Sequence, residues 1–281
     1  MAREFAKWFS TLVRPPVHPF NLAIEENIPY SKWQYKMGQK TIENYLDFTS
    51  KDQMFKDKEV LDIGCGASGK SLYYASLGAK KVTGIEVVSY YKEEAENLAN
   101  ELGLSDKFEF VIGDAAKMPF ADQSFDTVIM NDAMEHVDDP LGVLEEINRV
   151  LKVGGRLYVN FPPYYHPYGA HLSDVMGTPW VQLFFSEETL AGVYRDLVKD
   201  LPDGKKRIDF RIGKDEKGKD YFKYINHMTL KRFKKIKKAQ PMKIIYEREI
   251  PLRWYFTPLA KIPLIKEMFV KMFVCVMEKE K

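Results

Sequence analysis

The stretch VLDIGCGASGK, residues 60–70, joins an apolar β-type run to a glycine turn and the start of a helical pattern. Short β-branched runs and longer helical patterns alternate from there to residue 161, which is typical of βαβ units around a parallel sheet. The pattern therefore predicts a doubly wound α/β core. The predicted strands are Glu59–Ile63, Lys81–Glu86, Phe108–Ile112, Phe125–Asn131 and Gly155–Phe161, and the predicted helices are Gly69–Leu77, Tyr90–Leu102 and Pro140–Leu151.

The glycine turn indicates a ligand site. Gly64, Gly66 and Gly69 allow a tight turn close to a ligand, and the helix that follows presents unpaired N–H groups. This spacing also fits a dinucleotide fingerprint, so a nicotinamide-dependent dehydrogenase is one alternative. Two carboxylates favour a different ligand. Glu86, at the end of the second strand, suits a ribose diol, whereas Asp62 would repel a pyrophosphate and attract a cationic amino group.

The motifs beyond the turn carry a resemblance to a known family. They are Glu86 in GIEVV, the run Gly113-Asp114-Ala115, then FDTVIMNDAMEHV and RVLKVGGRLYVNFP. In this order they resemble the class I S-adenosylmethionine-dependent methyltransferases, specifically the small-molecule type 11 group. The resemblance implies S-adenosyl-L-methionine as cofactor and a Rossmann-like α/β fold. Its seven-stranded sheet would be mostly parallel, with KMFVCVMEK, residues 271–279, as an antiparallel edge strand.

The same resemblance implies which residues hold the cofactor. The methionine part is bordered by Asp62, Gly64, Cys65 and Gly66, and the ribose hydroxyls are bound by Glu86, with Val87 beside it. The adenine amino group donates a hydrogen bond to Asp114, with Ala115 beside it. Asn131 starts the loop nearest the sulfonium, and Tyr30 lies in a region that closes over the cofactor. Plainer roles stay open for two of them. Asp114 alone would be a turn residue or helix cap, and Tyr30, with Trp33 and Tyr35, would be a packing residue.

Three histidines are candidates for a general base: His136, His166 and His171. The last two lie in PPYYHPYGAH, beyond the last parallel strand, where open α/β sheets bind ligands; a rigid aromatic loop is the equal alternative. For the Glu135-His136 pair, capping of a short helix is favoured. The spacing Asp132-x-x-Glu135-His136 also resembles the Glu-x-x-Glu-His arrangement of metal-using methyltransferases. An aspartate shortens the first arm, so a metal-assisted O-methyltransferase is kept only as an alternative and no metal site is expected.

The segments outside the core predict a cap and a lid. We expect an N-terminal helical cap over residues 1–58 with an amphipathic helix at Lys36–Asp47, the cofactor core over 59–161, a substrate lid over 162–240, and, within 241–281, final strands at Met242–Ile250 and Lys271–Glu278. The run from Lys205 to Lys238 is strongly basic. Such a run is ordinarily a solvated face, but it would also attract an anionic small molecule or anionic lipid headgroups.

One aromatic stretch bears on partners. RWYFTPLAKIPLIKEMF, residues 253–269, is expected to be buried against the lid, with a peripheral membrane contact as the alternative. The 281 residues carry 42 basic and 40 acidic side chains, a net charge of +2, which argues against a nucleic-acid binder. Cys65 and Cys275 show no metal or disulfide spacing, and no signal peptide or bilayer-spanning run is found. We therefore expect a cytoplasmic protein.

The expected function is methyl transfer from S-adenosyl-L-methionine to a small-molecule acceptor. A hydroxyl of a sugar or of a secondary-metabolite intermediate is the favoured nucleophile. A regulatory protein that binds the cofactor without transferring its methyl group is the alternative from another class.

Overall fold

The computed structural model describes residues 2–16, 18, 21 and 28–281, which divide into two compact units. Unit 1 draws on residues 1–26, 162–230 and 251–271. Unit 2 draws on residues 27–161, 231–250 and 272–281. The predicted cap, lid and final segment are therefore each shared between two units that are interleaved along the chain.

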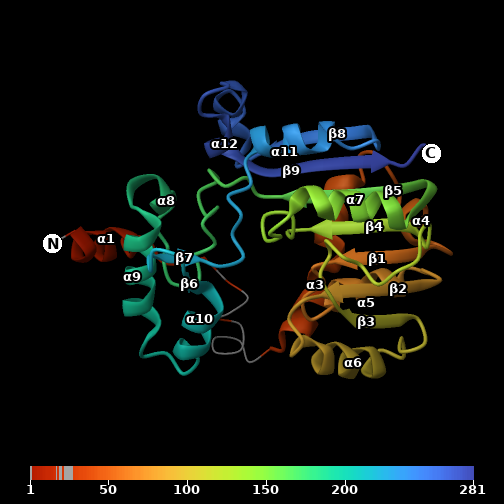
Figure 1. The fold of residues 1–281 in the computed structure, drawn as a ribbon, viewed down its shortest axis with the longest axis horizontal. Coiled ribbons are helices and arrows are strands. Elements are labelled where there is room, and N and C mark those ends of the chain that lie inside the picture. Colours follow the sequence, from red (N-terminus) through yellow and green to blue (C-terminus); the bar gives the residue numbers. More distant parts are fainter. Residues whose placement is uncertain (1, 17, 19–20, 22–27) are drawn as a thin grey trace. The chain divides into compact units, whose positions relative to one another are not determined.

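Unit 2 is built on a seven-stranded sheet in the order β3-β2-β1-β4-β5-β9-β8 (Figure 1). Its strands are β1 Glu59–Ile63, β2 Lys81–Glu86, β3 Phe108–Ile112, β4 Phe125–Asn131, β5 Leu151–Phe161, β8 Lys243–Pro251 and β9 Val270–Glu278. Strands β3, β2, β1, β4 and β5 are parallel, and β9 runs antiparallel to β5. The predicted Rossmann-like α/β fold is confirmed. The antiparallel strand β9 lies one place inside the edge, because β8 covers its outer side.

The helices of unit 2 are α3 Tyr30–Ile42, α4 Lys51–Phe55, α5 Gly69–Ser76, α6 Tyr91–Glu101, α7 Pro140–Val150 and α11 Leu230–Lys238, with a 3-10 turn η2 at Glu43–Tyr45. Helix α7 begins where predicted, because Pro140 suits its first turn and Asp139 accepts the Gly142 N–H at 3.0 Å. It ends directly in β5. Gly154, which is left-handed with φ +76°, lies inside that strand.

Unit 1 has a helical core beside a small two-stranded antiparallel sheet. Its elements are α1 Ala2–Ser10, α8 Val181–Phe184, α9 Glu187–Val198, α10 Gly204–Arg211, β6 Ile212–Lys214, β7 Asp220–Phe222, η3 Trp254–Phe256, η4 Leu259–Lys261 and α12 Lys266–Phe269. Buried apolar side chains of α9, among them Leu190 and Tyr194, pack in one cluster with Ala6 of α1. This burial draws the N-terminal helix into unit 1. Among the described residues, none of the helices is both long enough and apolar enough to cross a membrane.

The basic run from Lys205 to Lys238 is not a uniform solvated face. Arg207 and Arg211 are buried in unit 1, and each forms an ion pair with the buried carboxylate of Asp174, at 3.2 and 3.6 Å. Lys237 on α11 is also buried, pairs with Glu247, and has its pKa lowered by burial. Part of the predicted charge is thus neutralised inside the protein and is not available to an anionic ligand.

Candidate functional site

The glycine turn between β1 and α5 lies at the carboxyl edge of the sheet. Gly64 and Gly66 adopt left-handed conformations, with φ of +69° and +54°. A Cβ on Gly64 would lie 2.8 Å from the Cβ of Ala133, in the loop after β4. Glycine is therefore required here both for conformation and for the close approach of that loop.

Helix α3 holds the turn from the side. Gln34 accepts the Gly69 N–H at 3.1 Å and donates to the Cys65 carbonyl at 3.4 Å. The ring of Tyr30 approaches to 3.5 Å from the position that a Cβ on Gly66 would take. Tyr30 thus borders the turn, and its contact with the cofactor stays a prediction. The role of Gln34 was not predicted. A single glutamine in a helix can hold a neighbouring loop or lie at the surface, and the sequence does not distinguish the two.

Asp62 is a buried carboxylate at the end of β1. It is 4% exposed and accepts a hydrogen bond from the Ser71 hydroxyl at 2.6 Å. Burial raises the pKa of Asp62 from 3.8 to about 6, although the Ser71 hydrogen bond and Lys70 oppose the change. The carboxylate is therefore charged at neutral pH at a cost in free energy, which a cationic ligand group would reduce.

Lys70, in the first turn of α5, supplies a cation beside this carboxylate. Its ammonium lies 3.2 Å from Asp132 Oδ2. Burial lowers the pKa of Lys70, but the charges of Asp132, Tyr30 and Asp62 outweigh burial and leave the pKa raised. Negative and positive groups therefore alternate around the turn. Lys70 was missed in the sequence because a lysine in a first helical turn is commonly just exposed.

Glu86 ends β2 and closes the turn from the opposite side. Its two oxygens accept the N–H groups of Gly66 and Val88, both at 3.0 Å. A carboxylate has about four lone-pair sites, so it can still accept two hydroxyls. Next to it, Val87 and Ile112 are 53% and 50% exposed and form an apolar surface at the ends of β2 and β3.

Asp114 follows β3 on the same edge of the sheet. It is exposed, and its Oδ1 accepts the Ala116 N–H at 2.9 Å, while Ala115 is buried. The hydrogen bond makes Asp114 a turn residue, which was one of its two predicted roles. Its position at a strand end beside exposed Ile112 also suits recognition of a flat, hydrogen-bonding ring.

Comparison with known proteins identifies the family of the domain that contains the glycine turn. A family model for a methyltransferase domain matches residues 61–159. Residues 61–159 are a class I methyltransferase domain. The domain belongs to the type 11 group, and its cofactor is S-adenosyl-L-methionine.

Relatives match part of the chain. A sterol 24-C-methyltransferase from Gibberella zeae is 44% identical over 97 residues, which cover 34% of this chain and 26% of that protein. A probable chloroplastic tocopherol O-methyltransferase from Oryza sativa subsp. japonica is 38% identical over 120 residues, covering 42% of this chain and 33% of that protein. The chain thus spans a third or less of the length of these relatives.

Solved structures extend the likeness in fold. A SAM-dependent methyltransferase from Methanosarcina mazei is 26% identical, with a TM-score of 0.52 over 81% of this chain and 95% of that chain. Geranyl diphosphate C-methyltransferase from Streptomyces coelicolor A3(2) is 14% identical, with a TM-score of 0.57 over 99% of this chain and 97% of that chain. The second comparison shows the fold alone.

Asn131 ends β4 of the methyltransferase domain, but its side chain is held by other residues. Its Oδ1 accepts hydrogen bonds from the Tyr45 hydroxyl at 2.6 Å and from Asn160 at 2.7 Å, and its amide donates to Tyr74 at 3.4 Å. This buried network fixes the end of β4. A contact between Asn131 and the cofactor stays a prediction, for which its main chain is better suited than its side chain.

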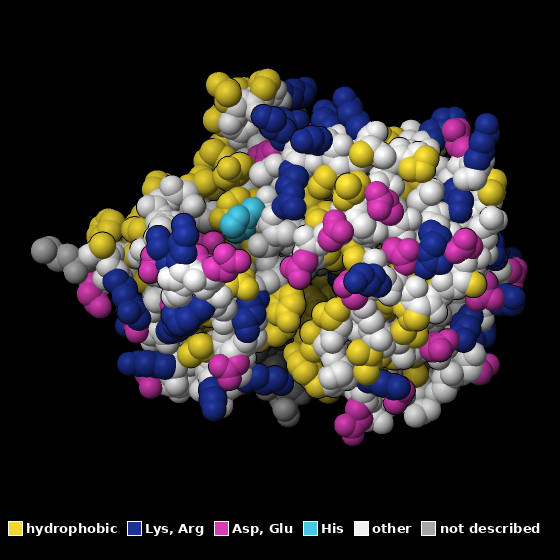
Figure 2. Space-filling view, in the orientation of Figure 1, with side chains coloured by type: hydrophobic (Ala, Val, Ile, Leu, Met, Phe, Trp, Pro, Cys, Tyr) yellow, Lys and Arg dark blue, Asp and Glu magenta, His cyan; other side chains and the backbone are white. Residues whose placement is uncertain are grey.

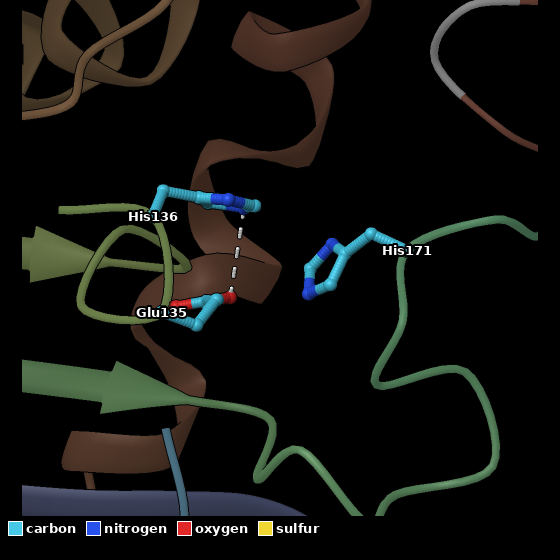
Figure 3. A group of neighbouring side chains, drawn as sticks. All are labelled: Glu135, His136 and His171. Atoms are coloured by element: carbon cyan, nitrogen blue, oxygen red, sulfur yellow. Dashed lines mark ion pairs between the residues drawn. The ribbon is translucent and has the colours of Figure 1, made fainter. Parts of the chain in front are cut away.

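The loop after β4 does not form the short helix that Glu135 and His136 were expected to cap. Residues 133–136 form a turn in which His136 N–H donates to Ala133 O at 3.0 Å, and the cap of α7 is Asp139. His136 Nε2 lies 3.9 Å from Glu135 Oε1 (Figure 3). Burial, with Asp132 adding to it, raises the pKa of Glu135 well above its ordinary value. The His136 side chain is 35% exposed, whereas the Glu135 side chain is buried.

The metal-using alternative has little support from these side chains. The Asp132 carboxylate already pairs with the Lys70 ammonium. A hard cation would compete with Lys70 for this carboxylate. The ion pair therefore weighs against a divalent ion at Asp132.

The other two candidate bases lie in unit 1. His166 accepts the Tyr168 N–H at its Nδ1 at 3.2 Å, and burial, aided by the charge of Lys271, lowers its pKa to about 4. His171 has a φ of +54°, and its carbonyl accepts a hydrogen bond from Arg211. Because a base with a pKa near 4 accepts protons poorly at neutral pH, His166 is the weaker candidate.

Unit 1 also contains a cavity of about 210 Å³. Its wall includes the apolar side chains of Phe185, Leu190 and Phe222, with Glu187 and His227 as polar groups. The residues of the pattern PPYYHPYGAH that line it are Tyr164 and Ala170. Pockets that bind drug-sized ligands have volumes of about 300–1,000 Å³. The smaller volume of this cavity suits a single ring or a short chain.

Proposed function

We propose that this chain transfers the methyl group of S-adenosyl-L-methionine to a hydroxyl of a small molecule. The alternation of charge at the glycine turn, Asp62 beside Lys70, carries the proposal. The methionine part of the cofactor is a zwitterion, with an ammonium for Asp62 and a carboxylate for Lys70. A pyrophosphate, which the dehydrogenase alternative requires, would face the Asp62 carboxylate instead.

The remaining cofactor groups have partners of matching chemistry in unit 2. Glu86 would accept the two ribose hydroxyls, since its carboxylate retains lone pairs beyond those used by Gly66 and Val88. Val87 and Ile112 offer apolar surface to the adenine ring, and Asp114 would accept from its amino group. When bound, the cofactor supplies a methyl group on a sulfonium sulfur, which is a good leaving group.

His136 is the proposed general base. It lies in the same unit as the turn, on the loop that packs against Gly64. As the acceptor oxygen forms its bond to the methyl carbon and the bond from carbon to sulfur breaks, His136 would take the hydroxyl proton. General-base catalysis of this kind contributes about 10²–10⁴-fold in rate, and orientation of the acceptor provides the rest.

The cavity of unit 1 is proposed to select the acceptor. Gln182 lines it, and its side-chain amide donates to the carbonyls of Tyr164 and His166, at 3.1 and 2.8 Å. The wall also offers the polar side chains of Glu187 and His227. The cavity thus suits a hydroxylated ring with an apolar body. Sterol and tocopherol, the acceptors in the relatives' names, are also hydroxylated and apolar.

The test is turnover of methyl-labelled S-adenosyl-L-methionine with a panel of hydroxylated ring compounds and sugars. We expect S-adenosylhomocysteine together with an O-methyl product, identified by mass and by its NMR shift. Gln182→Leu should raise KM for the acceptor and leave the cofactor Kd unchanged. A C-methyl product would contradict the hydroxyl acceptor. Tight cofactor binding without product on any acceptor would favour the regulatory binding protein.

A further inference from the structure

The segment from Trp254 to Leu264 in unit 1 exposes large apolar side chains. Trp254 is 83% exposed and Leu264 is 96% exposed, and Tyr255 and Ile262 are 55% and 43% exposed. No residue from Pro251 to Phe269 is buried. The expectation that this stretch is buried against the lid is therefore wrong. The helical turns η3, η4 and α12 instead hold the apolar side chains outward.

The segment is anchored at its base. Leu252 N–H donates to Phe269 O at 2.8 Å, and the rings of Phe256 and Phe269 pack with their centroids 5.1 Å apart. The Glu267 carboxylate accepts the Leu230 N–H at 2.9 Å. Because these contacts hold the two ends of the segment together, its tip has a defined structure. Exposure of Trp254 and Leu264 is a property of this fold.

All the charged side chains from residue 253 to residue 266 are basic. Arg253 and Lys261 are exposed beside the apolar side chains, and Lys266 and Lys271 follow. Glu267 is the one acid between residues 251 and 271, and it is used in the anchor. Figure 2 shows yellow apolar and dark blue basic side chains together at this tip, which Figure 1 places next to α12. The surface therefore combines tryptophan, tyrosine and aliphatic side chains with cations.

We infer that residues 253–264 dock on an anionic lipid surface, with Trp254, Ile262 and Leu264 entering the interface. Aromatic side chains favour the headgroup level, aliphatic ones the acyl boundary, and lysine and arginine the anionic phosphates. A symmetric contact between two copies of the chain would instead bring Arg253 and Lys261 against their own equivalents. Docking goes beyond the proposed methyl transfer and does not depend on it.

The experiment is flotation of the full chain, without cofactor, on vesicles of phosphatidylcholine alone and of phosphatidylcholine mixed with phosphatidylserine. We expect binding to the mixed vesicles. Trp254→Ser and Leu264→Ser should each lower partitioning about tenfold, because each removes one inserted apolar side chain. Lys261→Ala should lower it about fivefold on mixed vesicles only, since one cation near an anionic surface is lost.

Val153→Ser is the matched control, because Val153 is 56% exposed but lies in unit 2. It should bind vesicles like the unchanged chain. All variants alter exposed side chains, so thermal melting and cofactor affinity should not change. Failure of the unchanged chain to float would overturn the inference, as would undiminished binding by the Trp254→Ser/Leu264→Ser variant. Dimerisation that this double variant abolishes, without vesicle binding, would assign the surface to a second copy.

Discussion

Replacement of Asp62 by asparagine should stabilise the cofactor-free protein and weaken cofactor binding at the same time. The asparagine has nearly the same shape and keeps an acceptor for the Ser71 hydroxyl, which donates to Asp62 at 2.6 Å. The substitution removes the buried charge. Without cofactor this relieves a cost, whereas with cofactor it removes the partner of the ammonium.

The size of the effect follows from the pKa of Asp62, which burial raises from 3.8 to about 6. At 1.36 kcal/mol for each pKa unit, ionisation of the buried carboxylate costs about 3 kcal/mol above pH 6. The Asp62→Asn variant should gain at most about this amount. Loss of a charged hydrogen bond to the ligand costs about 1.5–3 kcal/mol, a roughly 10- to 150-fold increase in Kd.

The sign of the pH dependence is also fixed. Between about pH 4 and pH 6 the folded protein keeps a proton on Asp62 that the unfolded chain has released, so stability falls as pH rises through this range. The variant lacks this fall, and its advantage should open between about pH 4 and pH 6 and then stay constant. Cofactor affinity of the unchanged chain should drop about tenfold per pH unit below pH 6.

Urea unfolding at about pH 4 and pH 7 measures the stability difference, and titration calorimetry with S-adenosylhomocysteine measures binding. Asp114→Asn is the control for stability, because it removes the same charge from an exposed position and should change the free energy of unfolding by no more than about 0.5 kcal/mol. The reasoning is refuted if Asp62→Asn lowers the stability of the cofactor-free protein, or if its affinity stays within twofold of the unchanged chain.

Other substitutions test the rest of the site. Glu86→Gln should raise the Kd for the cofactor about tenfold or more in calorimetry, because one charged acceptor for the ribose is lost. His136→Ala should lower kcat about 10²–10⁴-fold without changing that Kd, whereas His166→Ala should change kcat little; the opposite order would contradict the assignment. Asp174→Ala should cost about 3–5 kcal/mol in urea unfolding, since it leaves Arg207 and Arg211 buried without their shared carboxylate. Removal of divalent ions by a chelator should leave turnover unchanged, and a loss of activity that added Mg²⁺ restores would revive the metal-using alternative.

The sheet was predictable from the sequence because its central strands are buried on both faces. Strands β1 and β4 are buried at nearly every position, and glycines or polar turns mark their ends. The position of β9 inside the sheet was not predictable in the same way. Strand order depends on which edges a later segment can reach, and the apolar run of β9 would be the same at either place.

Residues of the candidate site could be predicted only where their position at the end of a strand indicates their role. Asp62 and Glu86 stand at strand ends, so topology alone brings them to one edge. Gln34 and Lys70 act through partners that lie 31 and 62 residues away, at Cys65 and Asp132. A single sequence does not contain such pairings. For the same reason, the exposure of Trp254 could not be seen in a composition that equally suits a buried core.

Strand β9 has a consequence for the order in which the protein is made. It is synthesised after every other strand, yet it belongs between β5 and β8. Until residues 270–278 leave the ribosome, the nascent chain carries an unpaired β5 edge, and β8 lacks its neighbour. Unit 2 is completed last, because its residues 272–281 follow the last segment of unit 1. During that interval the open edge is the point where the growing chain is most exposed to pairing with another.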